Sequence, residues 1–258
     1  MMRLGIQTIV FGKRTGEDFE GVLHDIKAAG YDGVEFGFRA NQTATQVKAT
    51  LDKFGLACAG YHAGYNLFSE TENLRQQAAQ LAEIGGKYFM CSGIEGWQKA
   101  DKDAYARSCE VFNKAGTLLK NEFGLTFCYH NHNWEFKSLP TGEKGMDLIL
   151  AQTDPAMVKF CLDVYWVACG GEDPAAYIRK HRERAVYFHF KDGTYDTATQ
   201  ERKTFTELGR GDVDLKSAMA AVREVSPEWI VTEQDSTDGE PAESARISAD
   251  YARRELSI

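Results

Sequence analysis

Four ionisable residues in the sequence could together hold a divalent metal ion. His130, Asp163, His189 and Glu233 each follow a short apolar run, at intervals of about one strand-and-helix unit. Two imidazoles and two carboxylates without a thiolate suit Mn²⁺, which we expect first, or Co²⁺, Mg²⁺ or Zn²⁺. Any one of these residues alone is more often a hydrogen-bonded structural group, but four buried ionisable groups without a counter-ion would be costly. The set therefore predicts one bound ion, with coordination positions left for substrate oxygens.

Short strand-like runs alternate with helical patterns along the whole chain and indicate where these residues lie. The runs are rich in Val, Ile, Phe, Tyr or Cys and cover residues 4–10, 33–38, 57–62, 87–92, 125–132, 158–166, 185–190 and 229–232. Several lack polar alternation, as expected of parallel strands that are covered on both faces.

Amphipathic helices are predicted between these strands. The first has Thr15 as its expected N-cap and stops at Gly30, and the later ones cover residues 45–54, 73–84, 102–123, 146–152, 173–184, 214–225 and 242–255. Eight strand-helix pairs predict an α/β fold, a (β/α)₈ TIM barrel forming a single domain over residues 1–258. A doubly wound sheet would usually carry a Gly-rich phosphate fingerprint after its first strand, which the residues after Val10 do not match. In a barrel the carboxyl ends of the strands form the active-site face, where the four candidate ligands would meet.

Composition and charge narrow the class of function. The 258 residues include 30 Lys and Arg against 38 Asp and Glu, and this net charge of −8 argues against a nucleic-acid partner. No apolar stretch reaches the roughly 20 residues of a membrane-spanning helix, and the N-terminus does not resemble a signal peptide. We therefore expect a cytoplasmic protein without a membrane partner, compatible with a homo-oligomer. The six cysteines form no Cys-x-x-Cys pair, which predicts reduced, buried thiols.

The order of the motifs resembles the xylose isomerase-like barrels. This family includes sugar phosphate isomerases/epimerases, ketose 3-epimerases, inosose dehydratases and the apurinic-site endonucleases. The resemblance extends from LGIQT at 4–8 through GYDGVEF at 30–36, YHNH at 129–132 and LD at 162–163 to HFKD at 189–192, LGRGDVD at 208–214 and VTEQD at 231–235. It implies a divalent metal bound by a residue of the fifth strand together with Asp163, His189 and Glu233.

The sequence departs from this family pattern on the fifth strand, where the epimerases carry a Glu that is both ligand and base. Here His130 and His132 share one face of the predicted strand, and Glu135 follows. We expect His130 to be the ligand and His132 to face the substrate, with the reverse assignment open. Without that Glu, epimerisation by two carboxylates is in doubt, and isomerisation or β-elimination by one base and one acid is left.

The predicted chemistry is proton removal from the carbon next to a carbonyl. A metal that holds a ketone oxygen and a neighbouring hydroxyl would act as a Lewis acid and stabilise the enediolate. Glu233 or His132 would take the proton, and Lys191 would donate one. Further residues at the predicted strand ends could contact the substrate: Glu35 and His62 on the opposite side of the mouth, Glu135, the aromatic residues Trp134, Tyr165 and Trp166, and Arg210 if the substrate is anionic. For Arg210, a plain loop followed by an N-cap is the favoured interpretation.

The leading hypothesis is therefore a metal-dependent isomerase or epimerase of a sugar, sugar phosphate or keto-sugar. The alternative is a dehydratase of a keto-polyol or keto-sugar, of the inosose dehydratase type, and a non-catalytic sugar-binding barrel is a remote third. The endonuclease branch fits poorly. Resemblance to that branch would imply a trinuclear zinc site with an additional His on the sixth strand, where this chain has Trp166.

Overall fold

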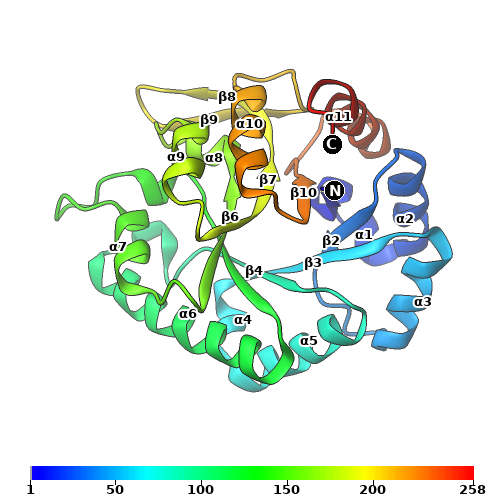
Figure 1. The fold of residues 1–258 in the computed structure, drawn as a ribbon, viewed down its shortest axis with the longest axis horizontal. Helices are drawn as coiled ribbons and strands as arrows, with labels where there is room; N and C mark the ends of the chain where they lie inside the picture. Colours follow the sequence, from blue (N-terminus) through cyan, green and yellow to red (C-terminus); the bar gives the residue numbers. More distant parts are fainter. Residues whose placement is uncertain (1) are drawn as a thin grey trace.

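A computed structural model describes residues 2–258 and confirms the predicted barrel. Eight parallel strands close on themselves in the spatial order β1-β10-β7-β6-β5-β4-β3-β2 (Figure 1). They are β1 (Arg3–Gln7), β2 (Gly33–Phe36), β3 (Ala57–Gly64), β4 (Tyr88–Ser92), β5 (Thr126–His130), β6 (Val158–Asp163), β7 (Ala185–Phe190) and β10 (Trp229–Thr232). All strands run the same way, so their carboxyl ends meet at one end of the barrel.

Helices form the outer layer around these strands (Figure 1). They are α2 (Phe19–Ala28), α3 (Ala44–Phe54), α5 (Thr71–Glu83), α6 (Lys102–Phe123), α7 (Gly145–Gln152), α9 (Pro174–Lys180), α10 (Leu215–Val225) and α11 (Pro241–Glu255). Helix α10 illustrates why the sequence forms them. Asp214 caps its first turn by accepting from Ser217 N at 3.0 Å, and Leu215, Met219 and Val222 recur at helical spacing and are buried.

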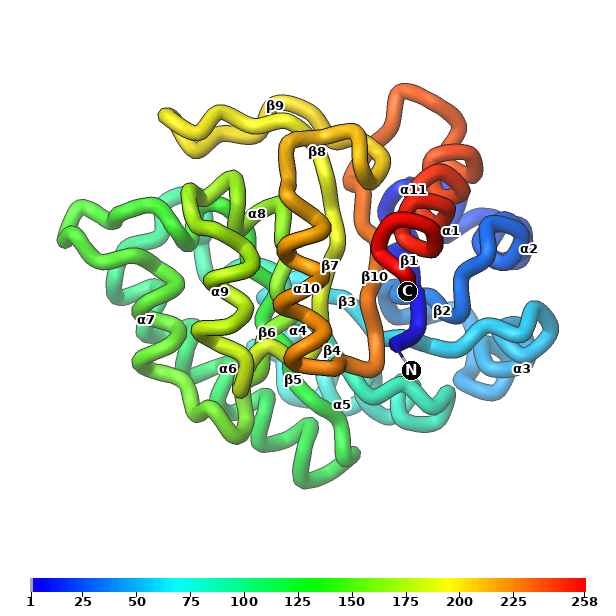
Figure 2. The backbone as a smooth tube through the Cα atoms, turned by 45° about the horizontal axis from the view of Figure 1, so that its top comes forward, coloured from blue at the N-terminus to red at the C-terminus, as the bar shows by residue number. Residues whose placement is uncertain are grey.

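Short elements follow the strands at the carboxyl end of the barrel. They are η1 (Thr8–Phe11), α1 (Arg14–Glu17), α4 (Tyr65–Ser69), η2 (Trp97–Lys99), η3 (Trp134–Phe136), α8 (Val164–Cys169) and an antiparallel hairpin of β8 (Asp192–Asp196) and β9 (Glu201–Thr206). Figure 2 shows the hairpin above α8 and α9, at one end of the barrel. None of the helices in residues 2–258 is long and apolar enough to span a bilayer.

Several local predictions were wrong. Asp18, not Thr15, caps the helix α2, since its carboxylate accepts from Gly21 N at 3.0 Å. Strands β5 and β6 end at His130 and Asp163, before His132 and Trp166, because the backbone turns there into a loop and into α8. The hairpin of β8 and β9 was not predicted at all.

The barrel interior contains two layers of side chains. The lower layer, which we call the apolar plug, consists of Ala59, Met90, Cys128, Cys161, Tyr187, Trp229 and Val231, all of them buried. The upper layer, which we call the polar rim, consists of Glu35, His62, Ser92, His130, Asp163, His189 and Glu233. On most of these strands a rim residue stands two positions after a plug residue, so both point to the same face. All six cysteines are buried and unbridged, as predicted.

Candidate metal centre

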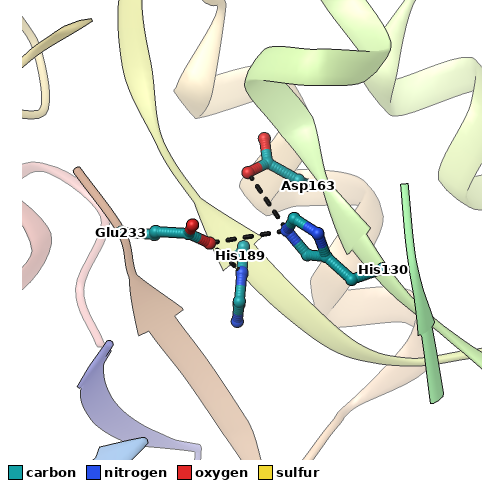
Figure 3. Close-up of side chains that lie close together, drawn as sticks. All are labelled: His130, Asp163, His189 and Glu233. Atoms are coloured by element: carbon teal, nitrogen blue, oxygen red, sulfur yellow. Dashed lines mark ion pairs between the residues drawn. The ribbon is translucent and has the colours of Figure 1, made fainter. Parts of the chain in front are cut away.

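The structure brings the four predicted ligands together in the polar rim. His130, Asp163, His189 and Glu233 are all buried, and one ligand atom from each lies within 4.8 Å of the others. His130 Nε2 is 3.6 Å from Asp163 Oδ2 and 3.4 Å from Glu233 Oε2, and the same Glu233 oxygen contacts His189 Nδ1 (Figure 3). Two nitrogens and two oxygens thus converge from four different strand ends.

These four facing atoms have no hydrogen-bond partner. His130 Nε2, Asp163 Oδ2, His189 Nδ1 and Glu233 Oε2 are all buried and unpaired among the described residues. A buried polar atom without a partner normally costs free energy, and such atoms are rare in folded proteins. A divalent cation would be bound by all four atoms at once, so the donor set and its unpaired atoms fit such an ion.

The other polar atom of each of these side chains is anchored by the protein. His130 Nδ1 is 3.3 Å from Ser92 Oγ, and His189 Nε2 is 2.8 Å from Glu35 Oε2. Asp163 Oδ1 caps α8 by accepting from Trp166 N at 3.0 Å, and Glu233 Oε1 accepts from Lys191 Nζ at 3.3 Å. Each candidate ligand is therefore held by one atom and presents the other, as outer hydrogen bonds do in metal sites.

The electrostatics of the group favour positive charge at its centre. Burial opposes ionisation of Glu233, but Lys191 and His189 hold its pKa well below the usual range. Burial likewise disfavours the imidazolium forms, yet the nearby acidic side chains of Asp163 and Glu233 raise the pKa of His130, and neighbouring acidic groups raise that of His189. The lowered pKa of Glu233 and the raised pKa values of the facing imidazoles both indicate a negative potential at the centre of the group, which would also favour a bound cation.

Lys191 and His132 lie beside this group. The Lys191 ammonium is buried, also donates to Asp235, and is 3.8 Å from Asp163 Oδ2. Burial opposes its charge, but Glu233 and Asp235 raise its pKa. His132 lies in the loop after β5, where its backbone N–H donates to Glu135 Oε2 at 2.8 Å. Its ring stacks on Trp134 at 3.8 Å, and burial lowers its pKa to about 4.

Glu35 and His62 come from β2 and β3, which lie across the closed barrel from β6 and β7, as the sequence led us to expect, but their side chains reach the candidate ligands. Glu35 is fully buried and contacts both His189 and His62. Burial opposes its ionisation, but His189 and His62 lower its pKa to about 2.

Of the remaining residues predicted to contact substrate, some lie beside the candidate metal centre and others do not. The Trp166 ring is 4.9 Å from Lys191 Nζ and 5.6 Å from the His132 ring. Tyr165 donates its hydroxyl to Thr194 O of the hairpin, and Glu135 is buried and accepts from Tyr129 and His132. Arg210 is exposed and pairs with Glu207, so the structure does not bring it to the rim group.

Two residues of the site were missed from the sequence. Ser92 links His62 to His130, and Asn131 joins the ends of β5 and β6 by accepting from Asp163 N at 3.0 Å. Ser92 could have been found, since it is the polar last residue of a predicted strand. The role of Asn131 depends on which strand lies beside β5 and has no signal of its own in the sequence.

The chain belongs to the xylose isomerase-like TIM barrel family, whose model matches residues 23–255. The inosose dehydratase of Geobacillus kaustophilus (strain HTA426) is 24% identical over 269 residues, which cover 90% of this chain and 86% of that protein.

Solved structures show the same fold. A sugar phosphate isomerase/epimerase from Parabacteroides distasonis ATCC 8503 has a TM-score of 0.82 and 23% identity, over 98% of this chain and 94% of its own. The IolI protein with a binding zinc atom has a TM-score of 0.76 and 12% identity, over 99% of this chain and 98% of its own. The relatives thus include both a dehydratase and an isomerase/epimerase.

Proposed function

We propose that the protein is a metal-dependent enzyme that removes a proton from the carbon next to the carbonyl of a sugar, sugar phosphate or keto-sugar, with isomerisation or epimerisation as the outcome. The observation that carries this proposal is the convergence of four unpaired, buried ligand atoms beside a buried lysine. Membership of a family with enzyme relatives supports it, and the zinc bound by the IolI protein supports a metal here. Bound by His130, Asp163, His189 and Glu233, an ion such as Mn²⁺ would supply a Lewis acid for the carbonyl oxygen.

Different side chains around the candidate metal centre would accept and donate the proton. Glu233, whose pKa is held low by Lys191 and His189, contacts Lys191, and His132 approaches from the loop after β5. Glu233 or His132 would accept the proton from carbon, and Lys191 would donate a proton to a substrate oxygen. Trp134 covers the His132 ring and Trp166 lies against Lys191, so both indoles would pack on the apolar side of the substrate and exclude water.

A dehydratase acting on a keto-polyol or keto-sugar is the second candidate. The inosose dehydratase relative favours it. The first step is the same, since elimination also begins with loss of the proton next to the carbonyl. The outcomes separate afterwards, because Lys191 would protonate a leaving hydroxyl group instead of a carbonyl oxygen. The two candidates therefore share their base and acid and differ in the product.

Deuterium exchange tests the shared step, and the product then separates the candidates. The Mn²⁺-loaded protein is incubated in D₂O with a panel of ketoses, keto-sugars and keto-polyols, and the mixtures are followed by NMR and mass spectrometry. We expect deuterium at the carbon next to the carbonyl in at least one compound. Isomerisation or epimerisation conserves the carbon skeleton and its oxygens, whereas elimination loses one water and yields an absorbing enone or diketone.

Two variants control this experiment. Glu233→Gln should lower the exchange rate by about 10²-fold or more, as expected for loss of a general base. Arg210→Gln should leave the rate unchanged, because Arg210 is exposed and pairs with Glu207. Absence of exchange with every compound, in protein shown to contain the metal, would refute the proposed chemistry.

A further inference from the structure

A chain of hydrogen bonds connects the two imidazoles of the candidate metal centre on the side away from the unpaired atoms. Glu35 Oε2 lies 2.8 Å from His189 Nε2, and Glu35 Oε1 lies 2.7 Å from His62 Nδ1. His62 Nε2 contacts Ser92 Oγ, which lies 3.3 Å from His130 Nδ1. The chain therefore runs from one candidate ligand to the other through three side chains that do not belong to the ligand set.

With His62 neutral and Glu35 ionised, only one arrangement of protons satisfies every contact when His130 and His189 each present a lone pair to a metal. His189 Nε2–H then donates to Glu35, and His130 Nδ1–H donates to Ser92 Oγ. The Ser92 hydroxyl donates its own hydrogen bond to His62 Nε2. His62 therefore carries its proton on Nδ1 and donates to the second Glu35 oxygen. Both arms of the chain thus end at one carboxylate, and each donor meets an acceptor.

We propose that Glu35, His62 and Ser92 are positioning residues that fix which nitrogen of His130 and of His189 faces the metal. The inference rests on the metal centre of the proposed function and gives Glu35 and His62 a role other than contact with substrate. A carboxylate behind a ligand imidazole fixes its tautomer and raises its basicity. Here one carboxylate serves two imidazoles, His189 directly and His130 through the Ser92–His62 arm.

The same residues could be mistaken for a second metal site, since ligand atoms of Glu35, His62 and His189 also lie within 4.8 Å of one another. The pairing of their atoms argues otherwise. The contacts of Glu35 with both imidazoles have hydrogen-bond lengths, and no polar atom of Glu35 or His62 is among the buried unpaired atoms of the described residues. The facing atoms of the four candidate ligands lack hydrogen-bond partners, whereas Glu35 pairs with both His62 and His189.

The tautomers of the unmodified protein provide the direct test. Zn²⁺ is diamagnetic, so ¹⁵N NMR of the Zn²⁺-loaded full chain reports which imidazole nitrogen carries a proton. We expect His130 and His62 to be protonated at Nδ1 and His189 at Nε2. A different tautomer at either ligand, or two zinc ions per chain, would overturn the proposal.

Metal affinity in variants provides the second test. Ser92→Ala should weaken Co²⁺ or Mn²⁺ binding by about 10- to 100-fold, and Glu35→Gln by at least as much because it serves both arms. Ser92→Thr keeps the hydroxyl and should restore most of the affinity lost in Ser92→Ala. Ser108→Ala is the matched control, since that hydroxyl is buried in α6 and bonds Ala104 O.

These readouts separate failure of the chain from failure of the proposed enzyme. Unchanged affinity in both Ser92→Ala and Glu35→Gln would overturn the positioning role even if the protein catalyses exchange. Conversely, the expected tautomers and affinities in a protein that exchanges no substrate proton would leave the positioning role in place and refute only the chemistry. Equal losses in Ser92→Ala and Ser108→Ala would also overturn it, because the effect would then be structural.

Discussion

The apolar plug and the polar rim share one barrel interior, two residues apart on the same strands. Cys161 precedes Asp163, Tyr187 precedes His189, and Val231 precedes Glu233 on a common inward face. Below, the side chains are hydrocarbon, thiol or aromatic and pack against one another. Above, the polar side chains hydrogen-bond to one another, and the four candidate ligands among them are hydrogen-bonded on one side only.

This difference teaches where the barrel gains stability and where it holds binding capacity. Burial of the plug side chains stabilises the fold through the hydrophobic effect, whether or not a metal ion is bound. The four candidate ligands of the rim lose contact with water without completing their hydrogen bonds, so their favourable free energy is realised only when a cation binds. The two layers should therefore respond differently to substitution and to metal.

Removal of a rim ligand should have the largest effect, on metal binding. In wild-type protein a divalent ion at 100 times its Kd should raise the free energy of unfolding by about 2.7 kcal/mol. His189→Ala should abolish this increment at the same metal concentration, because it removes one of four ligands and one of the two imidazole partners of Glu35. Urea unfolding with chelator and with Mn²⁺, together with elemental analysis, measures both quantities. Full metal occupancy in His189→Ala and in Asp163→Ala would contradict the site.

Removal of a plug side chain should do the reverse. Met90 is fully buried, and Met90→Ala should lower the free energy of unfolding by about 2–5 kcal/mol through lost burial and a cavity. The loss should be the same with chelator and with metal, and the metal increment should persist. Urea unfolding of the same two samples checks this. A plug variant that loses the metal increment would show that the two layers are not independent.

The sequence was sufficient to predict the barrel and the four side chains that meet as candidate ligands, and the reason is physical. A period of two along each strand, one strand per unit and a polar residue after each apolar run place His130, Asp163 and His189 at neighbouring strand ends. The same period cannot say where a strand stops. His132 and Trp166 were placed within predicted strands, although the chain had already turned after His130 and after Asp163.

The hairpin and the hydrogen-bond chain could not be predicted from the sequence, for other reasons. Much of β9 is exposed, so the hairpin has little apolar alternation, and it is held by cross-strand bonds and by Phe205 against Tyr165. The chain links His130 to Ser92 between the paired strands β5 and β4, and it joins Glu35 of β2 to His189 of β7 across the barrel, so it depends on how the side chains meet inside the closed barrel. Which atom of His130 is anchored and which is free follows from that adjacency, and no local pattern encodes it.

The smallest effect is expected at the boundary of the two layers. Tyr187 belongs to the apolar plug, yet its buried hydroxyl has no hydrogen-bond partner among residues 2–258. Tyr187→Phe removes this hydroxyl and keeps the ring, so the free energy of unfolding should change by less than about 1 kcal/mol, and metal affinity should not change. Urea unfolding and Co²⁺ titration measure the two quantities. A loss of about 1–3 kcal/mol accompanied by weaker metal binding would mean that the hydroxyl donates to a rim group, because only a lost partner carries that cost. The boundary between the layers would then lie one residue lower on β7, and Tyr187 would count with the polar rim.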